Sequence, residues 1–133
     1  MTTPVSEYMS TPVLTVDAAT TLADAAGAMT AEGMHSLVVV SEDCRPEGVF
    51  TSTDLVAAVS EGAPPGGTTV GDLMTRDVVT VPPDESVASA AAVMRAEEVG
   101  HLPVADEQVV GILTETDLRT YLAETRAEPA GAE

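Results

Sequence analysis

The sequence contains an internal repeat, and this repeat limits the possible folds more than any other feature. The segment Val5–Val16 recurs 65 residues later as Val70–Val81, and Gly48–Leu55 recurs 63 residues later as Gly111–Leu118. The first copy therefore holds two additional residues, in the stretch 42–46, where a turn can absorb them. A repeat of this length indicates two copies of one supersecondary unit that bury a common core.

Each copy has the pattern strand, helix, strand, strand, helix. The short stretch 13–16 is β-branched, and 36–40 is a continuous apolar run, as expected for a strand covered on both faces. Thr20 and Thr21 can cap a helix whose apolar residues recur at helical spacing. The expected elements are 13–16, 22–29, 36–40, 48–51 and 53–60 in the first copy, and 78–81, 86–97, 101–105, 109–114 and 115–124 in the second.

These copies define the expected domains, 5–61 and 70–124, in an α+β fold. Residues 62–69 between them include a run of Gly, Ala and Pro, which interrupts regular structure and indicates a linker. Residues 125–133 are expected to form a disordered tail.

The charge of the chain argues against nucleic acid as a partner. Twenty-two acidic residues stand against five arginines, and the net charge is −17. Nucleic acids are bound largely through neutralisation of phosphates by basic side chains, which this chain hardly offers. Dispersed carboxylates without any lysine suggest a protein adapted to high salt, because salt screens their mutual repulsion; an acidic protein from a high-GC genome is the alternative.

No apolar run is long enough for a membrane span, and the first residues lack the pattern of a signal peptide. We therefore expect a cytoplasmic protein without a membrane partner. The single cysteine, Cys44, excludes an internal disulfide and a multi-cysteine metal site.

The two copies resemble a tandem pair of CBS domains (cystathionine-beta-synthase domains) from about residue 5 to residue 124. The resemblance is carried by paired landmarks, which are Met9-Ser10 with Met74-Thr75, Leu14-Thr15-Val16 with Val79-Thr80-Val81, His101-Leu102-Pro103-Val104, and the two Gly-aliphatic-aliphatic-Thr-x-x-Asp-Leu segments. It implies a stand-alone regulatory module in which two β-α-β-β-α repeats form a pseudo-two-fold disc. In nucleotide-binding members the clefts between the repeats hold AMP, ADP, ATP or S-adenosylmethionine, and two discs commonly form a homodimer.

The resemblance assigns Asp54 and Asp117 to the two hydroxyls of a ribose, and Thr51 and Thr114 to its neighbourhood. An ionised carboxylate offers two acceptor oxygens, which suits a vicinal diol. A capping box is the alternative, since Thr-x-x-Asp before an apolar helix can satisfy the first N–H groups without a ligand. Asp117 is the first candidate, because His101 and Arg119 share its repeat.

By the same resemblance, Thr15, Val16, Thr80 and Val81 match the strand whose backbone pairs with adenine. The alternative for all four is a plain buried strand.

Phosphate recognition departs from the family pattern. Nucleotide-sensing members often have a His-Arg pair before the second strand, whereas this chain has His35-Ser36 and Gly100-His101. Histidine is only partly charged at neutral pH, while arginine would be fully charged and bidentate. This disfavours ATP and favours AMP or a cationic ligand such as S-adenosylmethionine, although Arg76, Arg95 and Arg119 could supply charge; both histidines could equally be half-buried strand-edge residues.

We expect no catalytic activity, since one cysteine and two histidines form no recognisable catalytic set, and no cofactor beyond the adenosine ligand. Three hypotheses remain: an adenosine sensor that signals to a separate protein, a ligand-free dimerisation scaffold, and, more weakly, a metal-responsive module using Glu97, Glu98 and His101. A homodimer is expected through the alanine-rich helices around 22–29 and 87–94.

Overall fold

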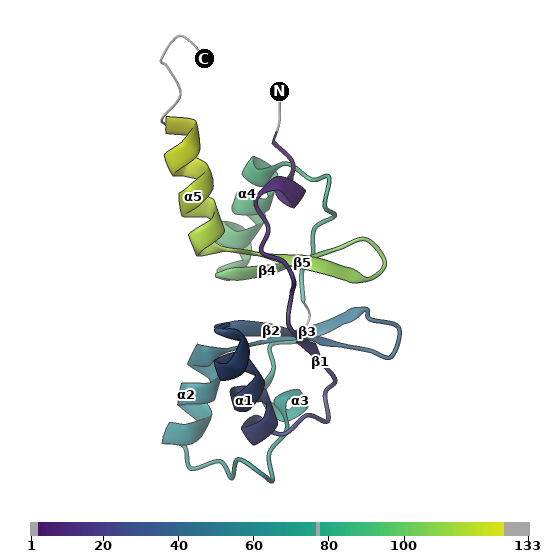
Figure 1. Cartoon of the computed structure of the whole chain (residues 1–133), viewed down its shortest axis with the longest axis vertical. Coiled ribbons are helices and arrows are strands. Elements are labelled where there is room, and N and C mark those ends of the chain that lie inside the picture. The colour runs from purple at the N-terminus through teal and green to yellow at the C-terminus, as the bar shows by residue number, and fades with distance from the viewer. Residues whose placement is uncertain (1–2, 77, 127–133) are drawn as a thin grey trace.

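The computed structural model describes residues 3–76 and 78–126, which form two similar halves (Figure 1). In each half helices cover the outer face of a small sheet, and the two sheets face each other at the centre. The elements in chain order are the short 3-10 turn η1 (Val5–Glu7), β1 (Thr15–Val16), α1 (Leu22–Glu32), β2 (Ser36–Val40), β3 (Pro46–Thr51), α2 (Ser52–Ser60), α3 (Val70–Leu73), α4 (Val87–Glu97), β4 (His101–Ala105), β5 (Val109–Thr114) and α5 (Glu115–Arg126). The α+β prediction is confirmed.

The strand pairings reproduce the sequence repeat. β1 runs parallel to β2, and β2 pairs antiparallel with β3. β4 and β5 form the equivalent hairpin, and both hairpins shift register at the same place, between Val39 and Val40 and between Val104 and Ala105. All five residues of β2 are buried, since helices cover one face and the other half covers the second.

The helices begin and end where local chemistry favours it. The hydroxyl of Thr21 accepts from the N–H of Asp24 at the start of α1, and Ser86 plays the same part for α4. Gly33 ends α1 in the left-handed conformation, with φ of 65°, which glycine adopts at little cost. Among the described residues, every helix is too short or too polar to span a lipid bilayer.

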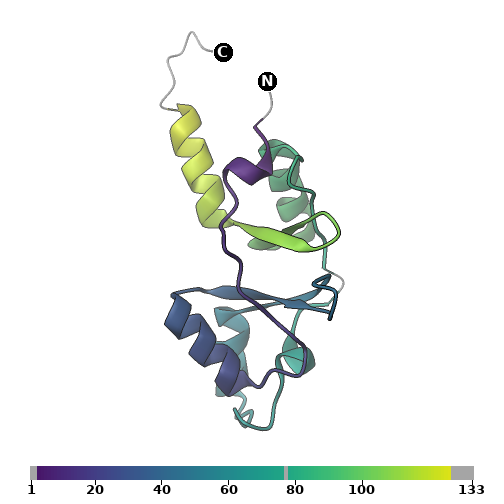
Figure 2. The same cartoon turned by 45° about the vertical axis from the view of Figure 1, so that its right-hand side comes forward.

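The segment that leads each repeat packs in the other half of the molecule. Val5 lies in the second hydrophobic core with Leu102 and Leu113, whereas Val70 and Met74 lie in the first, together with residues of α1, β2 and β3. Figures 1 and 2 show the N-terminal segment beside α4 before it crosses the centre to β1. The structural halves therefore differ from the two sequence repeats 5–61 and 70–124 in one respect, which is that the leading segment of each repeat packs on the half formed by the other.

Backbone hydrogen bonds fasten both exchanged segments in the same way. Ser10 pairs with Ile112 in both directions, at 2.8 and 3.2 Å, and Thr75 pairs with Val49, at 2.9 and 3.1 Å. A glycine beside each pair, Gly111 or Gly48, leaves room for a methionine of the crossing segment. These contacts fix the positions of the segments that line the space between the halves.

The prediction of a strand at 78–81 is wrong, because the sole pairing of this segment among the described residues is an isolated bridge between Val81 and Val104. In the first half the N–H of Val38 donates to the carbonyl of Leu14 at 2.9 Å. The equivalent residue in the second half is Pro103, which has no N–H. The ladder that extends β1 is therefore interrupted at its counterpart.

Two further differences concern the ends of elements. η1 and α3, in the leading segments, were not predicted. Helix α5 continues to Arg126, so the tail expected from residue 125 is helical in its first two residues, and the rest of that tail, 127–133, lies outside the described residues.

Candidate ligand cleft between the two halves

A cleft of about 610 Å³ lies between the two halves and brings together three of the predicted site residues, Thr51, Asp54 and His101. Its remaining lining comes from β3 and α2 of the first half, from the crossing segment and from the second half. These residues are Val49, Thr53, Thr75, Arg76, Val78, Val79, Glu97, Glu98, Val99, Gly100, Pro103 and Glu115. The cleft thus combines an apolar wall with carboxylates at its edge.

Asp54 forms a complete capping box with Thr51 at the start of α2. Its Oδ2 accepts from the N–H of Thr51 at 2.9 Å and from the Thr51 hydroxyl at 3.2 Å, while the Asp54 N–H donates to that hydroxyl at 3.4 Å. The capping alternative is therefore realised. It occupies only one carboxylate oxygen, however, since Oδ1 accepts no hydrogen bond from any described residue.

Asp117 makes the same cap with Thr114, and it has one additional partner. Its Oδ2 accepts from the N–H and the hydroxyl of Thr114 at 2.9 and 3.0 Å. The hydroxyl of Ser10 also lies 3.0 Å from Oδ1 and 3.1 Å from Oδ2. The two aspartates are equivalent in sequence but differ in the acceptor capacity that they leave for a ligand.

The surroundings of Asp117 differ as well. It lines a separate cavity of about 600 Å³ with Thr3, Glu7, Tyr8, Thr120, Glu124 and Thr125. The Tyr8 hydroxyl donates to Glu124, and this bond raises the pKa of Tyr8 to about 12 because it stabilises the protonated phenol. This cavity is acidic and hydroxyl-rich, without the valine wall of the cleft at Asp54.

His101 is half-buried in the cleft with Asp54. Its removal from water lowers the pKa of the imidazole below the ordinary value of 6.5, and this outweighs the opposing effect of the nearby Glu115 carboxylate. Because its pKa is lowered below 6.5, His101 is mainly a neutral hydrogen-bonding group at pH 7. His101 shares the cleft with Asp54, which belongs to the first repeat. The sequence had suggested a site in which His101 lies with Asp117 and Arg119 of its own repeat.

The cleft carries an excess of negative charge. Asp54, Glu97, Glu98 and Glu115 line it, and Arg76 is the one arginine among the described residues that do so. The guanidinium of Arg76 donates to the carbonyl of Gly71 at 2.7 Å, which directs part of its hydrogen-bonding capacity away from the cleft. Charge in this cleft therefore opposes an anionic ligand.

The other predicted residues lie outside this lining. Thr15 and Val16 form β1, beside Val38 and Val39, and Thr80 and Val81 lie beyond the cleft residues Val78 and Val79. His35 is exposed just before β2, and its carbonyl accepts from the N–H of Ser52. Its imidazole lies near enough to His101 to contribute to lowering the pKa of His101.

Sequence reasoning missed several cleft residues that come from the crossing segment. Thr75, Val78 and Val79 line the cleft because Thr75 pairs with Val49 and so carries its neighbours across the boundary. The repeated landmark, Met9-Ser10 in the first copy and Met74-Thr75 in the second, marked this segment. The local sequence pattern, however, did not show that this segment packs on the other half of the molecule.

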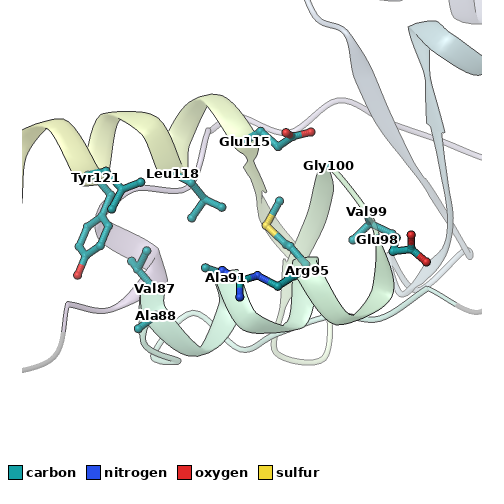
Figure 3. A pocket seen from close by; sticks show the side chains of 12 residues that line it. Val87, Ala88, Ala91, Arg95, Glu98, Val99, Gly100, Glu115, Leu118 and Tyr121 are labelled. Atoms are coloured by element: carbon teal, nitrogen blue, oxygen red, sulfur yellow. The ribbon is translucent and has the colours of Figure 1, made fainter.

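A third hollow, of about 690 Å³, lies between α4 and α5 (Figure 3). Val87 and Ala91 of α4 face Leu118 and Tyr121 of α5 across it. The large apolar side chains of the helices expected to form a dimer, such as Leu22 and Met94, are buried within the chain itself. Among the described residues, the large exposed hydrophobics are Val56 and Val59 of α2 and Leu122 of α5.

Comparison with known families gives a match to one family model over nearly the whole chain. The model, described as CBS domain, matches residues 5–61 and 70–124. Two curated relatives are the homoserine O-acetyltransferase of Methanosalsum zhilinae, 33% identical over 124 residues, and the L-aspartate semialdehyde sulfurtransferase of Methanocaldococcus jannaschii, 30% identical over 118 residues. The matches cover 92% and 87% of this chain, but only 24% and 22% of those proteins.

Among solved structures, the chain is similar to the CBS domain pair of protein MJ0100 in complex with 5′-methylthioadenosine and S-adenosyl-L-methionine. The TM-score is 0.85 at 28% sequence identity, and the match covers 94% of this chain and 99% of that one.

Proposed function

The chain belongs to the CBS domain family, and from this premise we propose that it is a regulatory module that binds an adenosine compound in the cleft of Asp54. The observation that carries the proposal is the Oδ1 of Asp54, which accepts no hydrogen bond from the described residues and lies in the cleft on a side chain whose cap uses only Oδ2. A ribose diol supplies the donors that this oxygen lacks. Val49, Val78 and Val79 offer an apolar surface to the adenine ring.

Within this class, we propose a neutral or cationic ligand, such as 5′-methylthioadenosine or S-adenosylmethionine, in preference to AMP, ADP or ATP. Four carboxylates and one arginine of the described residues line the cleft, and the lowered pKa of His101 leaves its imidazole mainly neutral at pH 7. Like charges at close range are repelled more strongly where solvent is partly excluded. The MJ0100 pair, which binds both of the proposed compounds, supports this choice.

The residues take modified roles in this proposal. The hydroxyl of Thr51 is used in the cap, so it serves to orient Asp54 and not to contact ribose. His101 can donate or accept one hydrogen bond to a hydroxyl or to a ring nitrogen of the ligand.

We propose a regulatory role and not a catalytic one. Two relatives with different enzyme names each match this chain over about a quarter of their own length. A region shared by enzymes with different chemistry is better suited to regulation than to either reaction. In the part of the chain that the structure describes, no group of His, Cys, Asp and Glu is arranged to hold a metal ion. A separate protein or a second copy of this chain would receive the signal.

A ligand-free scaffold is the second candidate, and the cap at Asp117 favours it. There, Thr114 and Ser10 satisfy both carboxylate oxygens without a ligand. If both oxygens of Asp54 were occupied in the same way, neither aspartate would have an acceptor left for a ribose, and the scaffold would be the better proposal.

Calorimetric titration of the chain in molar KCl tests the proposal, with 5′-methylthioadenosine, S-adenosylmethionine, AMP and ATP as separate ligands. We expect binding of the first two and at least about tenfold weaker binding of ATP, together with a raised melting temperature for the ligands that bind. Absence of binding by all four would favour the scaffold. Tighter binding of ATP than of S-adenosylmethionine would contradict the charge argument alone.

A further inference from the structure

We propose that Ser10 acts as an internal competitor at Asp117, so that each chain binds one adenosine compound, in the cleft of Asp54. This inference rests on the proposed function and adds to it the number of sites and the residue that determines that number. Its basis is a difference between two positions that the repeat makes equivalent.

The backbone geometry is the same at both positions. Ser10 bridges to Ile112 of β5 as Thr75 bridges to Val49 of β3, and each aspartate caps the helix that follows its strand. The side chains then differ. The Ser10 hydroxyl reaches both oxygens of Asp117, at 3.0 and 3.1 Å, whereas the described structure has no hydrogen bond between Thr75 and Asp54.

The hydroxyl of Ser10 takes the position that a ribose hydroxyl needs. The Ser10 hydroxyl lies within hydrogen-bond distance of Oδ1, the oxygen of Asp117 that the Thr114 cap leaves unused, so a ribose hydroxyl and Ser10 compete for this acceptor. Hydrogen bonds to an ionised group are among the stronger ones in proteins. A ligand at Asp117 must break such a bond before it gains its own, while a ligand at Asp54 breaks none.

The apolar walls differ in the same direction. Val13, Val38 and Ile112, which correspond to cleft residues Val78, Pro103 and Val49, pack together in one hydrophobic cluster between the sheets. Their counterparts line an open cleft of about 610 Å³. The second position therefore lacks both a free carboxylate oxygen and an open wall, so that the Asp117 site remains the weaker one even without Ser10.

Titration calorimetry with 5′-methylthioadenosine tests the inference on the full chain. For the wild type we expect about one equivalent per chain, which Asp54→Asn weakens at least about tenfold and Asp117→Asn leaves unchanged. In the Asp54→Asn background, Ser10→Ala should strengthen the remaining binding at least about tenfold, because it frees the oxygens of Asp117. Ser6→Ala in the same background is the matched control, since Ser6 is exposed on the same segment and its hydroxyl makes no hydrogen bond to any described residue.

Two results would overturn the inference while leaving the proposed function intact. One is two equivalents bound by the wild type, with Asp117→Asn abolishing one of them. The other is an Asp54→Asn, Ser10→Ala protein that binds no more tightly than Asp54→Asn alone. If neither the wild type nor any variant binds 5′-methylthioadenosine or S-adenosylmethionine, the proposed function fails, and the inference fails with it.

Discussion

Replacing Gly48 with alanine tests whether the exchanged packing of the leading segments holds the molecule together. A Cβ at this position would overlap the thioether sulfur of Met74 and would lie 3.0 Å from the carbonyl oxygen of Thr75. Met74 is buried, and the Thr75 carbonyl is fixed by its bond to the Val49 N–H. Neither neighbour can move without loss, so we expect the cost of an overpacked core, about 1–3 kcal/mol in the free energy of unfolding.

For a domain of this size each kcal/mol corresponds to roughly 4 °C, which gives a fall of about 4–12 °C in Tm. Thermal unfolding followed by circular dichroism in molar KCl measures it. Gly27→Ala is the matched control, because no atom lies within 4 Å of a Cβ there and α1 should gain about 0.5–1 kcal/mol.

Adding Met74→Ala to Gly48→Ala should produce a smaller total loss than the sum of the two single losses, because the methyl group then has room. A Gly48→Ala protein as stable as the wild type would show that the crossing segment is not closely packed on β3.

Three other predictions follow from charge, burial and the exposed surface. The pKa of His101 lies below 6.5 in the folded state and near 6.5 in the unfolded state, so its contribution to stability is complete above pH 6.5 and falls as the pH drops from there through the folded pKa. The free energy of unfolding, measured in urea at several pH values between 5 and 8, should therefore depend on pH differently in the wild type and in His101→Gln. Equal slopes of the unfolding free energy against pH would refute the assigned burial effect. With a net charge of −17 the melting temperature should rise between dilute buffer and molar KCl, and an unchanged Tm would show that carboxylate repulsion does not limit stability. The exposed Val59 and Leu122 lead us to expect a homodimer by light scattering in high salt, which Val59→Asp should shift toward monomer; a monomeric wild type at micromolar concentration would contradict it.

The parts of the fold that depend on local pattern were predictable from the sequence. Strand β2, buried on both faces, and the hairpin of β4 and β5 have the expected bounds, because apolar runs and turns are local signals. The absence of a strand at 78–81 was also predictable in principle, since Pro103 stands at the position equivalent to Val38, whose N–H donates to the Leu14 carbonyl in the first half.

The exchange of the leading segments could not be predicted in this way. The stripe of Val70 and Met74 is equally compatible with packing on either half, and only tertiary contacts decide between them. The same limit applies to the site. The Thr-x-x-Asp motif is identical in both copies, but whether its aspartate is free depends on the side-chain position of Ser10, far away in the sequence.

The central claim is that the free oxygen of Asp54 binds the ribose of an adenosine compound, and Asp54→Asn tests it most directly. The amide oxygen of asparagine can replace Oδ2 in accepting from the Thr51 N–H, so the cap of α2 is kept and the Tm without ligand should change little. The amide NH₂ then replaces Oδ1 and cannot accept from a ribose hydroxyl. A lost hydrogen bond to a charged group corresponds to about 1.5–3 kcal/mol, so the Kd for 5′-methylthioadenosine measured by calorimetry should rise roughly ten- to a hundredfold. A variant that binds as tightly as the wild type would contradict the claim.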